Sequence, residues 1–141
     1  MPEREKKGFV YLVGAGPGRA DLITLRGAER IRIADCIICD KLANPALLEM
    51  ARSDAEIVNV PKRIGAGSFT QDQINRILVD KALEGKIVVR LKGGDPCIFG
   101  RVTEEVVALN EVGVGFEIVP GITAAIAASE YTGIMLTDRR Y

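Results

Sequence analysis

The stretch Ile87-Val88-Val89-Arg90-Leu91-Lys92-Gly93-Gly94-Asp95-Pro96 decides the fold of this chain. It joins an apolar, β-branched run to a glycine-rich turn, a pattern that predicts a strand ending in a loop. The centre of the run is continuously apolar, which is typical of a strand covered on both faces, as in parallel sheets. We therefore expect a buried strand over residues 86–91, with a loop of functional interest directly after it.

Strand-like runs of this kind alternate along the chain with segments of helical periodicity. Strands are expected at residues 9–13, 36–39, 56–60, 86–91 and 116–119. Helices are expected at residues 22–35, from Asn44-Pro45, over 70–85 behind a Thr70-to-Gln73 capping box, at 103–113 and at 123–131. This alternation indicates βαβ units. The predicted fold class is α/β, a mostly parallel five-stranded sheet flanked by helices.

The loops that follow the strands are the expected ligand site, because open α/β sheets bind ligands beyond the carboxyl ends of their strands. These loops cover residues 14–18, 40–42, 92–101 and 120–124. In the 92–101 loop the glycines allow a ligand to approach the backbone closely, Asp95 offers a carboxylate, and Ile98 and Phe99 can wall an apolar pocket. A plain β-turn remains the alternative for this loop, and a plain helix cap at Thr123 remains the alternative for residues 120–124.

The glycines of residues 14–18 raise the possibility of a dinucleotide-binding site. The fingerprint G-x-G-x-x-G requires a third glycine at position 19, which is Arg19, and Pro17 removes a backbone N–H from the loop. Asp40, at the end of the next predicted strand, lies where a ribose-binding carboxylate is expected. A module that binds NAD therefore stays open as an alternative, as does a tight turn without a ligand.

Composition excludes several classes of function. The chain of 141 residues contains 19 Lys and Arg against 19 Asp and Glu, so it lacks the basic excess typical of a nucleic-acid-binding surface. It contains no histidine, which excludes Ser-His-Asp and Cys-His catalysis and histidine-containing zinc sites within it. A hydrophobic share of 48% is enough for a packed core. We expect neither a metal nor a nucleic-acid partner.

The cysteines Cys36 and Cys39 form a C-x-x-C inside an apolar run. A redox pair would lie at a helix N-terminus, whereas residues three apart on a strand point to opposite faces. We interpret both as buried core residues in a reducing compartment.

The chain begins with a charged segment that lacks the apolar core of a signal peptide. No stretch approaches the roughly 18 uninterrupted apolar residues of a membrane span. We expect a cytoplasmic domain without membrane contact, organised as a charged tail over residues 1–7 and one α/β domain over residues 8–141.

Several motifs, taken in order, resemble the tetrapyrrole (precorrin) methylase family. They are Val13-Gly14-Ala15-Gly16-Pro17-Gly18, Val89-Arg90-Leu91-Lys92-Gly93-Gly94-Asp95-Pro96 and Val119-Pro120-Gly121-Ile122-Thr123-Ala124. Ile64-Gly65-Ala66-Gly67-Ser68 and Phe99-Gly100-Arg101 are most similar to the uroporphyrinogen-III C-methyltransferases within that family. The resemblance covers nearly the whole chain.

The resemblance implies a two-domain methyltransferase that uses S-adenosylmethionine and releases S-adenosylhomocysteine. Only its N-terminal domain is similar to this chain, so we expect a fragment that lacks the second domain and the rest of the cofactor cleft. The residues that would line the cofactor site by motif are Pro17, Gly93, Gly94, Asp95, Ile98, Thr123 and Ala124.

The substrate that the resemblance implies is uroporphyrinogen III, methylated at C2 and C7 to precorrin-2 on the way to sirohaem or cobalamin. Its carboxylates require cations, for which we single out Lys41, Lys62 and Arg139, with Arg101 matching a family position near the reacting ring. The catalytic candidates are Arg101, Glu104 and Asp40. Because arginine is a poor base, we expect Arg101 to orient the substrate, while Glu104, Asp40 or a water takes the proton.

The family also implies a homodimer. Methylation of a later precorrin by the same fold is the alternative within the family. The alternatives from other classes are the NAD-binding module and a domain that only mediates interactions.

Overall fold

The computed structural model describes residues 6–60 and 69–141, and its centre is a parallel β-sheet. The strands are β1 (Phe9–Gly14), β2 (Cys36–Asp40), β3 (Glu56–Val60), β4 (Ile87–Lys92) and β5 (Gly115–Val119). They lie in the order β3-β2-β4-β1-β5, and every neighbouring pair is parallel. The predicted five-stranded α/β sheet is therefore confirmed within the described residues.

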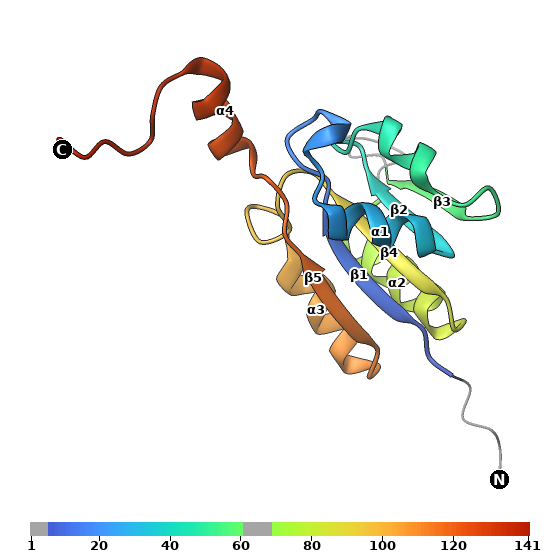
Figure 1. Ribbon diagram of the computed structural model, residues 1–141. Helices are drawn as coiled ribbons and strands as arrows, with labels where there is room; N and C mark the ends of the chain where they lie inside the picture. Colours follow the sequence, from blue (N-terminus) through green and yellow to red (C-terminus); the bar gives the residue numbers. More distant parts are fainter. Residues whose placement is uncertain (1–5, 61–68) are drawn as a thin grey trace, which may run out of the picture.

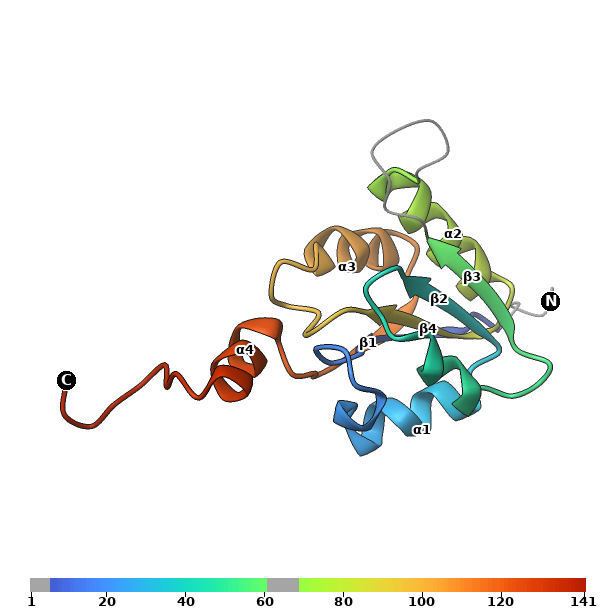
Figure 2. The same ribbon diagram turned by 90° about the horizontal axis from the view of Figure 1, so that it is seen from above.

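Helices cover both faces of the sheet, as Figures 1 and 2 show. The helix α1 (Leu25–Ile33) and the short 3-10 helix η2 (Pro45–Met50) cover one face. The helices α2 (Gln71–Leu83) and α3 (Val102–Glu111) cover the other. The helix α4 (Ala124–Thr132) and the C-terminal segment extend away from the sheet (Figure 1).

The caps show why several helices begin where they do. The predicted capping box is present, because the Thr70 backbone N–H donates to Gln73 Oε1 (2.8 Å) and the Gln73 N–H donates to Thr70 Oγ1 (3.2 Å). Asn44 caps η2 by accepting from the Ala46 N–H (2.9 Å). Thr123 occupies the N-cap position of α4, but its side chain makes no capping hydrogen bond.

The helix predicted over residues 22–35 is wrong in its first turn. The structure has a separate 3-10 helix, η1 (Ala20–Leu22), before α1. Thr24 separates the two, because its backbone is extended and its Oγ1 accepts from the Gly27 N–H (3.0 Å), which begins a new helix.

The core consists of two layers, one on each face of the sheet. Val88 packs with Leu78 and Leu109 under α2 and α3, while Val89 packs with Ile31 under α1. Cys36 and Cys39 divide between the same two layers and are both buried, as predicted. Burial raises the pKa of Cys36 to about 11 and also raises the pKa of Cys39.

The strand order differs from that of dinucleotide-binding folds, in which β1 lies next to β2. Here β4 lies between β1 and β2 and pairs with both. The Asp40 carboxylate, which a dinucleotide site would use for ribose, is buried and accepts a hydrogen bond from Arg90. The arrangement of the strands therefore disfavours the NAD-binding alternative.

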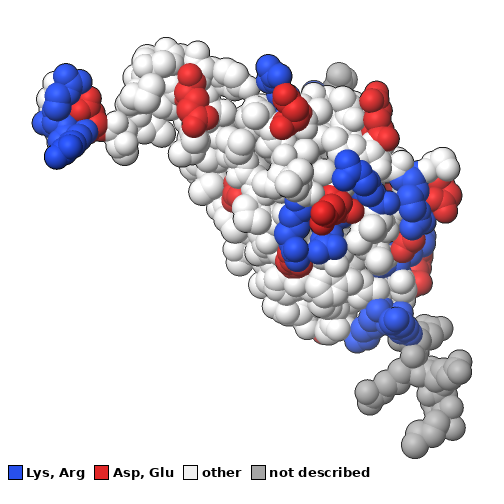
Figure 3. Space-filling model, in the orientation of Figure 1, with Lys and Arg blue, Asp and Glu red and all other residues white. Residues whose placement is uncertain are grey.

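The surface carries charges of both signs. On the face seen in Figure 3, basic and acidic side chains lie beside one another, in agreement with the equal numbers of both in the sequence. No helix in the described part of the chain is long and apolar enough to cross a membrane.

The positions of the three cysteines predict their reactivity. Because the thiolate is the reactive form, the buried Cys36 and Cys39 should react slowly with a thiol reagent, while the exposed Cys97 reacts fast. Labelling the native chain should show one fast thiol, and Cys97→Ser should remove the fast phase. Two or more fast thiols in the folded chain would contradict the burial of Cys36 and Cys39.

Candidate functional site

Three of the strand-end loops meet with their backbones in direct contact. Gly16 and Gly94 exchange hydrogen bonds, from Gly94 N to Gly16 O at 2.8 Å and from Gly16 N to Gly94 O at 3.1 Å. Any Cβ at Gly14 or Gly121 would overlap the carbonyl oxygen of Gly94. Glycine is therefore required where these loops touch.

Asp95 locks two of the loops together. Its Oδ1 accepts from the Cys97 N–H (2.9 Å) and its Oδ2 accepts from the Gly121 N–H (3.0 Å). Both carboxylate oxygens are thus bound to backbone donors. The carboxylate therefore joins residues 93–97 to the loop before α4, and the ligand contact expected for Asp95 from the sequence stays a prediction.

A cavity of about 460 Å³, which we call the loop pocket, opens between these loops. Its size lies within the range of ligand sites. Its lining includes all seven residues predicted for the cofactor, together with Asp40, Lys92 and Phe99. The lining residues are Gly16, Pro17, Asp40, Leu42, Lys92, Gly93, Gly94, Asp95, Ile98, Phe99, Gly100, Thr123, Ala124 and Ala125.

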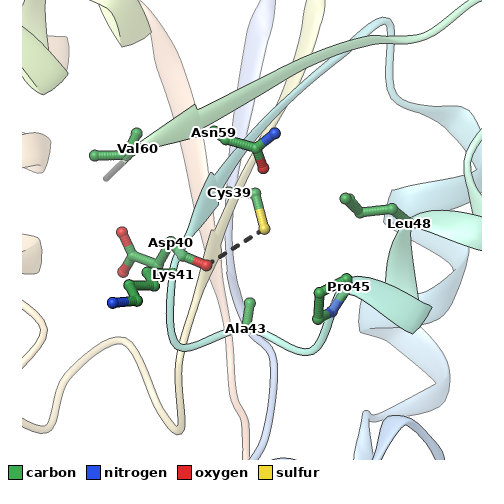
Figure 4. Close-up of a pocket in the computed structure, with 8 residues that line it drawn as sticks. All are labelled: Cys39, Asp40, Lys41, Ala43, Pro45, Leu48, Asn59 and Val60. Atoms are coloured by element: carbon green, nitrogen blue, oxygen red, sulfur yellow. Dashed lines mark hydrogen bonds between the residues drawn. The ribbon is translucent and has the colours of Figure 1, made fainter. Parts of the chain in front are cut away.

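A second cavity of about 420 Å³, which we call the side pocket, lies next to β2 (Figure 4). Asp40 lines both pockets and so lies between them. Lys41, predicted to bind substrate, lines the side pocket, and its side chain is exposed. Cys39 is held in the wall by a weak hydrogen bond from Sγ to the Asp40 carbonyl oxygen (3.5 Å).

Asp40 is held by a buried arginine. Arg90 Nη2 donates to Asp40 Oδ1 (2.7 Å), and the side chains of Arg90 and Asp40 are 1% and 6% exposed. Burial lowers the pKa of Arg90, but Glu105 and Asp40 outweigh it and raise the pKa overall. Arg90 therefore stays charged and fixes one oxygen of Asp40 at the edge of the loop pocket.

The predicted pair Arg101 and Glu104 forms a two-pronged ion pair. Arg101 Nε and Nη2 donate to the two oxygens of Glu104 at 2.8 and 2.7 Å, and both side chains are exposed. The hydrogen bond from Arg101 holds the pKa of Glu104 below its usual value. Neither residue lines the loop pocket, but Arg101 directly follows Gly100, which does.

Of the two remaining predicted substrate residues, the structure describes one, Arg139, and it lines neither pocket. Arg139 is exposed on the C-terminal segment beyond α4 (Figure 1). Lys62 lies outside the described residues.

Sequence reasoning missed a buried group of charges beneath the loop pocket. Glu105 accepts from Arg90 Nε (2.9 Å) and from Lys92 Nζ (2.9 and 2.8 Å), and all three side chains are at most 3% exposed. A signal was present, because Arg90 and Lys92 are two apart on a strand and share a face. Glu105 is likewise four residues before Leu109 on the buried side of α3.

Comparison with known proteins identifies the family. Residues 9–141 match the family described as Tetrapyrrole (Corrin/Porphyrin) Methylases. The chain belongs to the tetrapyrrole methylases.

Curated members of this methylase family are similar over almost the whole chain. The uroporphyrinogen-III C-methyltransferase of Priestia megaterium is 55% identical over 95% of this chain and 56% of its own length. That of Methanocaldococcus jannaschii is 52% identical over 94% of this chain and 55% of its own. A siroheme synthase of Pseudomonas putida is 55% identical over 97% of this chain and 30% of its own. This methylase chain therefore spans from 30% to 56% of the length of these relatives.

Solved structures of tetrapyrrole methylases have the same fold. The uroporphyrin-III C-methyl transferase of Thermus thermophilus, complexed with S-adenyl homocysteine, superposes with a TM-score of 0.78 at 42% identity, over 94% of this chain and 54% of that chain. A cobalt precorrin-4 methyltransferase superposes with a TM-score of 0.82 at 32% identity, over 94% and 53%.

The lock formed by Asp95 gives a prediction for stability. Asp95→Ala leaves the N–H groups of Cys97 and Gly121 without their acceptor, so the free energy of unfolding should fall by about 1–3 kcal/mol in urea denaturation. Asp54→Ala is the matched control, because Asp54 is exposed and pairs with Arg52 on the surface. Equal stability of the two variants would show that Asp95 does not hold the loops together.

Proposed function

We propose that this chain forms the S-adenosylmethionine-binding part of a uroporphyrinogen-III C-methyltransferase. The proposed reaction methylates C2 and C7 of uroporphyrinogen III to give precorrin-2, a precursor of sirohaem and cobalamin. The observation that carries the proposal is the loop pocket, in which all seven residues chosen by motif line one cavity. The names of relatives more than 50% identical to the chain support the substrate.

The residues of the loop pocket fit an adenosyl ligand. Gly16, Gly93 and Gly94 contribute backbone without side chains, so a folded ligand can lie directly against the chain. Pro17, Ile98 and Ala124 add apolar walls, and the N-terminus of α4 adds backbone N–H groups. Asp95 also lines the pocket, with its carboxylate held in place by two backbone N–H groups.

When bound, S-adenosylmethionine supplies a methyl group on a sulfonium, and the bond electrons stay on sulfur as the pyrrole carbon takes the methyl group. The contribution of the protein is to hold the two reactants in line. The loops at the carboxyl ends of β1, β4 and β5 hold one reactant, and the side of the pocket formed by Asp40 and Leu42 faces the other.

The methylated ring must lose a proton, and Asp40 is the better acceptor among the candidates. It lines the loop pocket, whereas Glu104 does not and is bound on both oxygens by Arg101. The Glu104 carboxylate raises the pKa of Arg101 further, so Arg101 cannot act as a base. We assign Arg101 to binding a substrate carboxylate, with Lys41 as a second cation at the side pocket.

Methylation of a later precorrin is the second candidate. The structural similarity to the cobalt precorrin-4 methyltransferase, with a TM-score of 0.82, favours this candidate. Identity to that protein is 32%, well below the identity to the uroporphyrinogen-III C-methyltransferases, so we keep uroporphyrinogen III as the substrate.

We further propose a homodimer in the cytoplasm. Large apolar side chains are exposed on α4 and the segment after it, and such a surface is typical of an interface. They are Ile126, Tyr131, Ile134, Met135 and Leu136. Sedimentation of the chain at increasing concentration tests the proposal, and a monomer throughout would contradict it for this chain.

Blocking the loop pocket should abolish binding of the adenosyl ligand. Ala124 lies at the first position of α4 and lines the pocket, so Ala124→Phe should weaken binding of S-adenosylhomocysteine by at least about tenfold. Amide NMR titration measures this even for weak binding, and the shifted signals should include those of Gly93, Gly94 and Thr123.

The matched control is Ala128→Phe, which places the same ring on the same helix at an exposed position outside the pocket lining. This variant should bind like the unchanged chain. Absence of any shift at millimolar ligand in the unchanged chain, or shifts with NAD alone, would overturn the proposed cofactor.

The role of Arg101 can be tested with uroporphyrin III, a stable tetrapyrrole that carries the same carboxylates. Arg101→Ala should weaken binding, while Glu104→Gln should strengthen it, because it releases the guanidinium from its internal partner. Fluorescence titration measures both. Arg19→Ala is the control, since Arg19 forms a similar exposed pair with Asp21. Equal effects of Arg101→Ala and Arg19→Ala would remove Arg101 from the substrate site.

A further inference from the structure

The loop between β4 and α3, residues 93–101, forms much of the loop pocket in an unusual backbone conformation. Phe99 and Arg101 both have φ of 53°, a left-handed conformation that costs free energy in residues other than glycine. Such residues persist only where their surroundings hold them. The Phe99 side chain is fully exposed, so its own packing does not supply the restraint.

The two ends of this loop are joined by a buried ion pair. Lys92 is the last residue of β4, directly before the loop, and Glu105 is in the first turn of α3, directly after it. Lys92 Nζ donates to both oxygens of Glu105 at 2.9 and 2.8 Å, and the two side chains are 3% and 0% exposed. We call this pair the clasp.

The loop also rests on the clasp. A Cβ at Gly100 would overlap the Pro96 carbonyl oxygen of the same loop and would come within 3.1 Å of Lys92 Cε, so the Lys92 side chain packs against the loop between Phe99 and Arg101. Lys92 at the same time lines the loop pocket. Lys92 therefore contacts the loop at Gly100, between the two left-handed residues, and also lines the pocket.

Further contacts anchor Glu105 itself. It accepts from Arg90 Nε (2.9 Å) and more weakly from Gln71 Nε2 of α2 (3.4 Å). Arg90 also donates to Asp40, the proposed proton acceptor. The Glu105 carboxylate is therefore linked through Lys92 to the loop and through Arg90 to Asp40.

Stability alone does not account for the clasp. Buried ion pairs are expensive to desolvate, and apolar side chains of similar volume often stabilise a fold as well or better. Burial lowers the pKa of Lys92, and the Glu105 carboxylate opposes that change. An ion pair in this place fixes the positions of two side chains, which an apolar contact would do less specifically.

We propose that Glu105 is a positioning residue, whose clasp with Lys92 holds residues 93–101 in the conformation that forms the loop pocket. The identity of the ligand rests on the function proposed above. The geometry of the loop does not rest on that function, so an experiment can contradict the positioning role of Glu105 without contradicting the proposed function, or the reverse.

The first test uses the unchanged chain without ligand. The Lys92 ammonium should give an NMR signal protected from exchange with water, because both of its oxygen partners are buried. The amide-to-α-proton couplings of Phe99 and Arg101 should report positive φ. A Lys92 signal that exchanges freely would overturn the proposal.

The second test replaces the clasp with apolar side chains, in Lys92→Met/Glu105→Leu. We expect this variant to unfold cooperatively, to lose the positive-φ couplings at Phe99 and Arg101, and to bind S-adenosylhomocysteine about tenfold more weakly. Lys92→Arg, which can still reach Glu105, should keep both the couplings and the affinity. Where the double variant fails to fold, the first test, on the unchanged chain, decides.

The matched control is Lys81→Met/Glu56→Gln, which removes a Lys–Glu pair at the opposite end of the sheet. It should leave the couplings and the affinity unchanged. Unchanged couplings at Phe99 and Arg101 in a folded clasp variant would overturn the proposal. If the unchanged chain shows the positive-φ couplings and the protected Lys92 signal but binds no S-adenosylhomocysteine, the proposed function is overturned and the positioning role of Glu105 is supported.

Discussion

The pairing of β4 on both sides is the constraint on which the rest of the structure depends. Because β4 lies between β1 and β2, its carboxyl end emerges between the loops that follow those two strands. The loop after β4 can then touch Gly16 on one side and approach Leu42 on the other. A sheet with β2 next to β1 would place β2 beside the loop after β1 and would not form this pocket.

The strand β4 has an apolar part, which packs in the core, and a charged part, which lies near the loop pocket. Val88 and Val89 pack into the two core layers near the middle of the sheet. Arg90 and Lys92 follow at the carboxyl end, where buried charge has counter-ions on β2 and α3. The buried charges, which are expensive to desolvate, thus lie next to the loop pocket, where we infer that their fixed positions serve the site as well as stability.

The sequence predicts the strands and most of the helices because their signals are local. The capping box at Thr70 and the apolar run around Val88 need no knowledge of distant residues. The order of the strands is not local, since nothing in the runs themselves says that β4 pairs with both β1 and β2. The motifs select the residues that line the loop pocket, but they do not reveal that Lys92 and Glu105 are partners. That pairing depends on the distance between a strand end and a helix, which only the folded chain sets.

Asp95 lines the loop pocket and also joins two of the loops that form it. A carboxylate in a glycine-rich loop suggests a contact with a charged or hydroxyl group, yet both of its oxygens accept from backbone N–H groups. The bond to Gly121 ties the end of β4 to the start of α4, and the glycines then allow the three loops to touch. The loop pocket that results is lined by glycine backbone and apolar side chains, together with Asp40, Lys92, Asp95 and Thr123. For the cofactor site that we propose, selectivity depends on how rigidly these loops are held, by the hydrogen bonds of Asp95 and, as we infer, by the clasp.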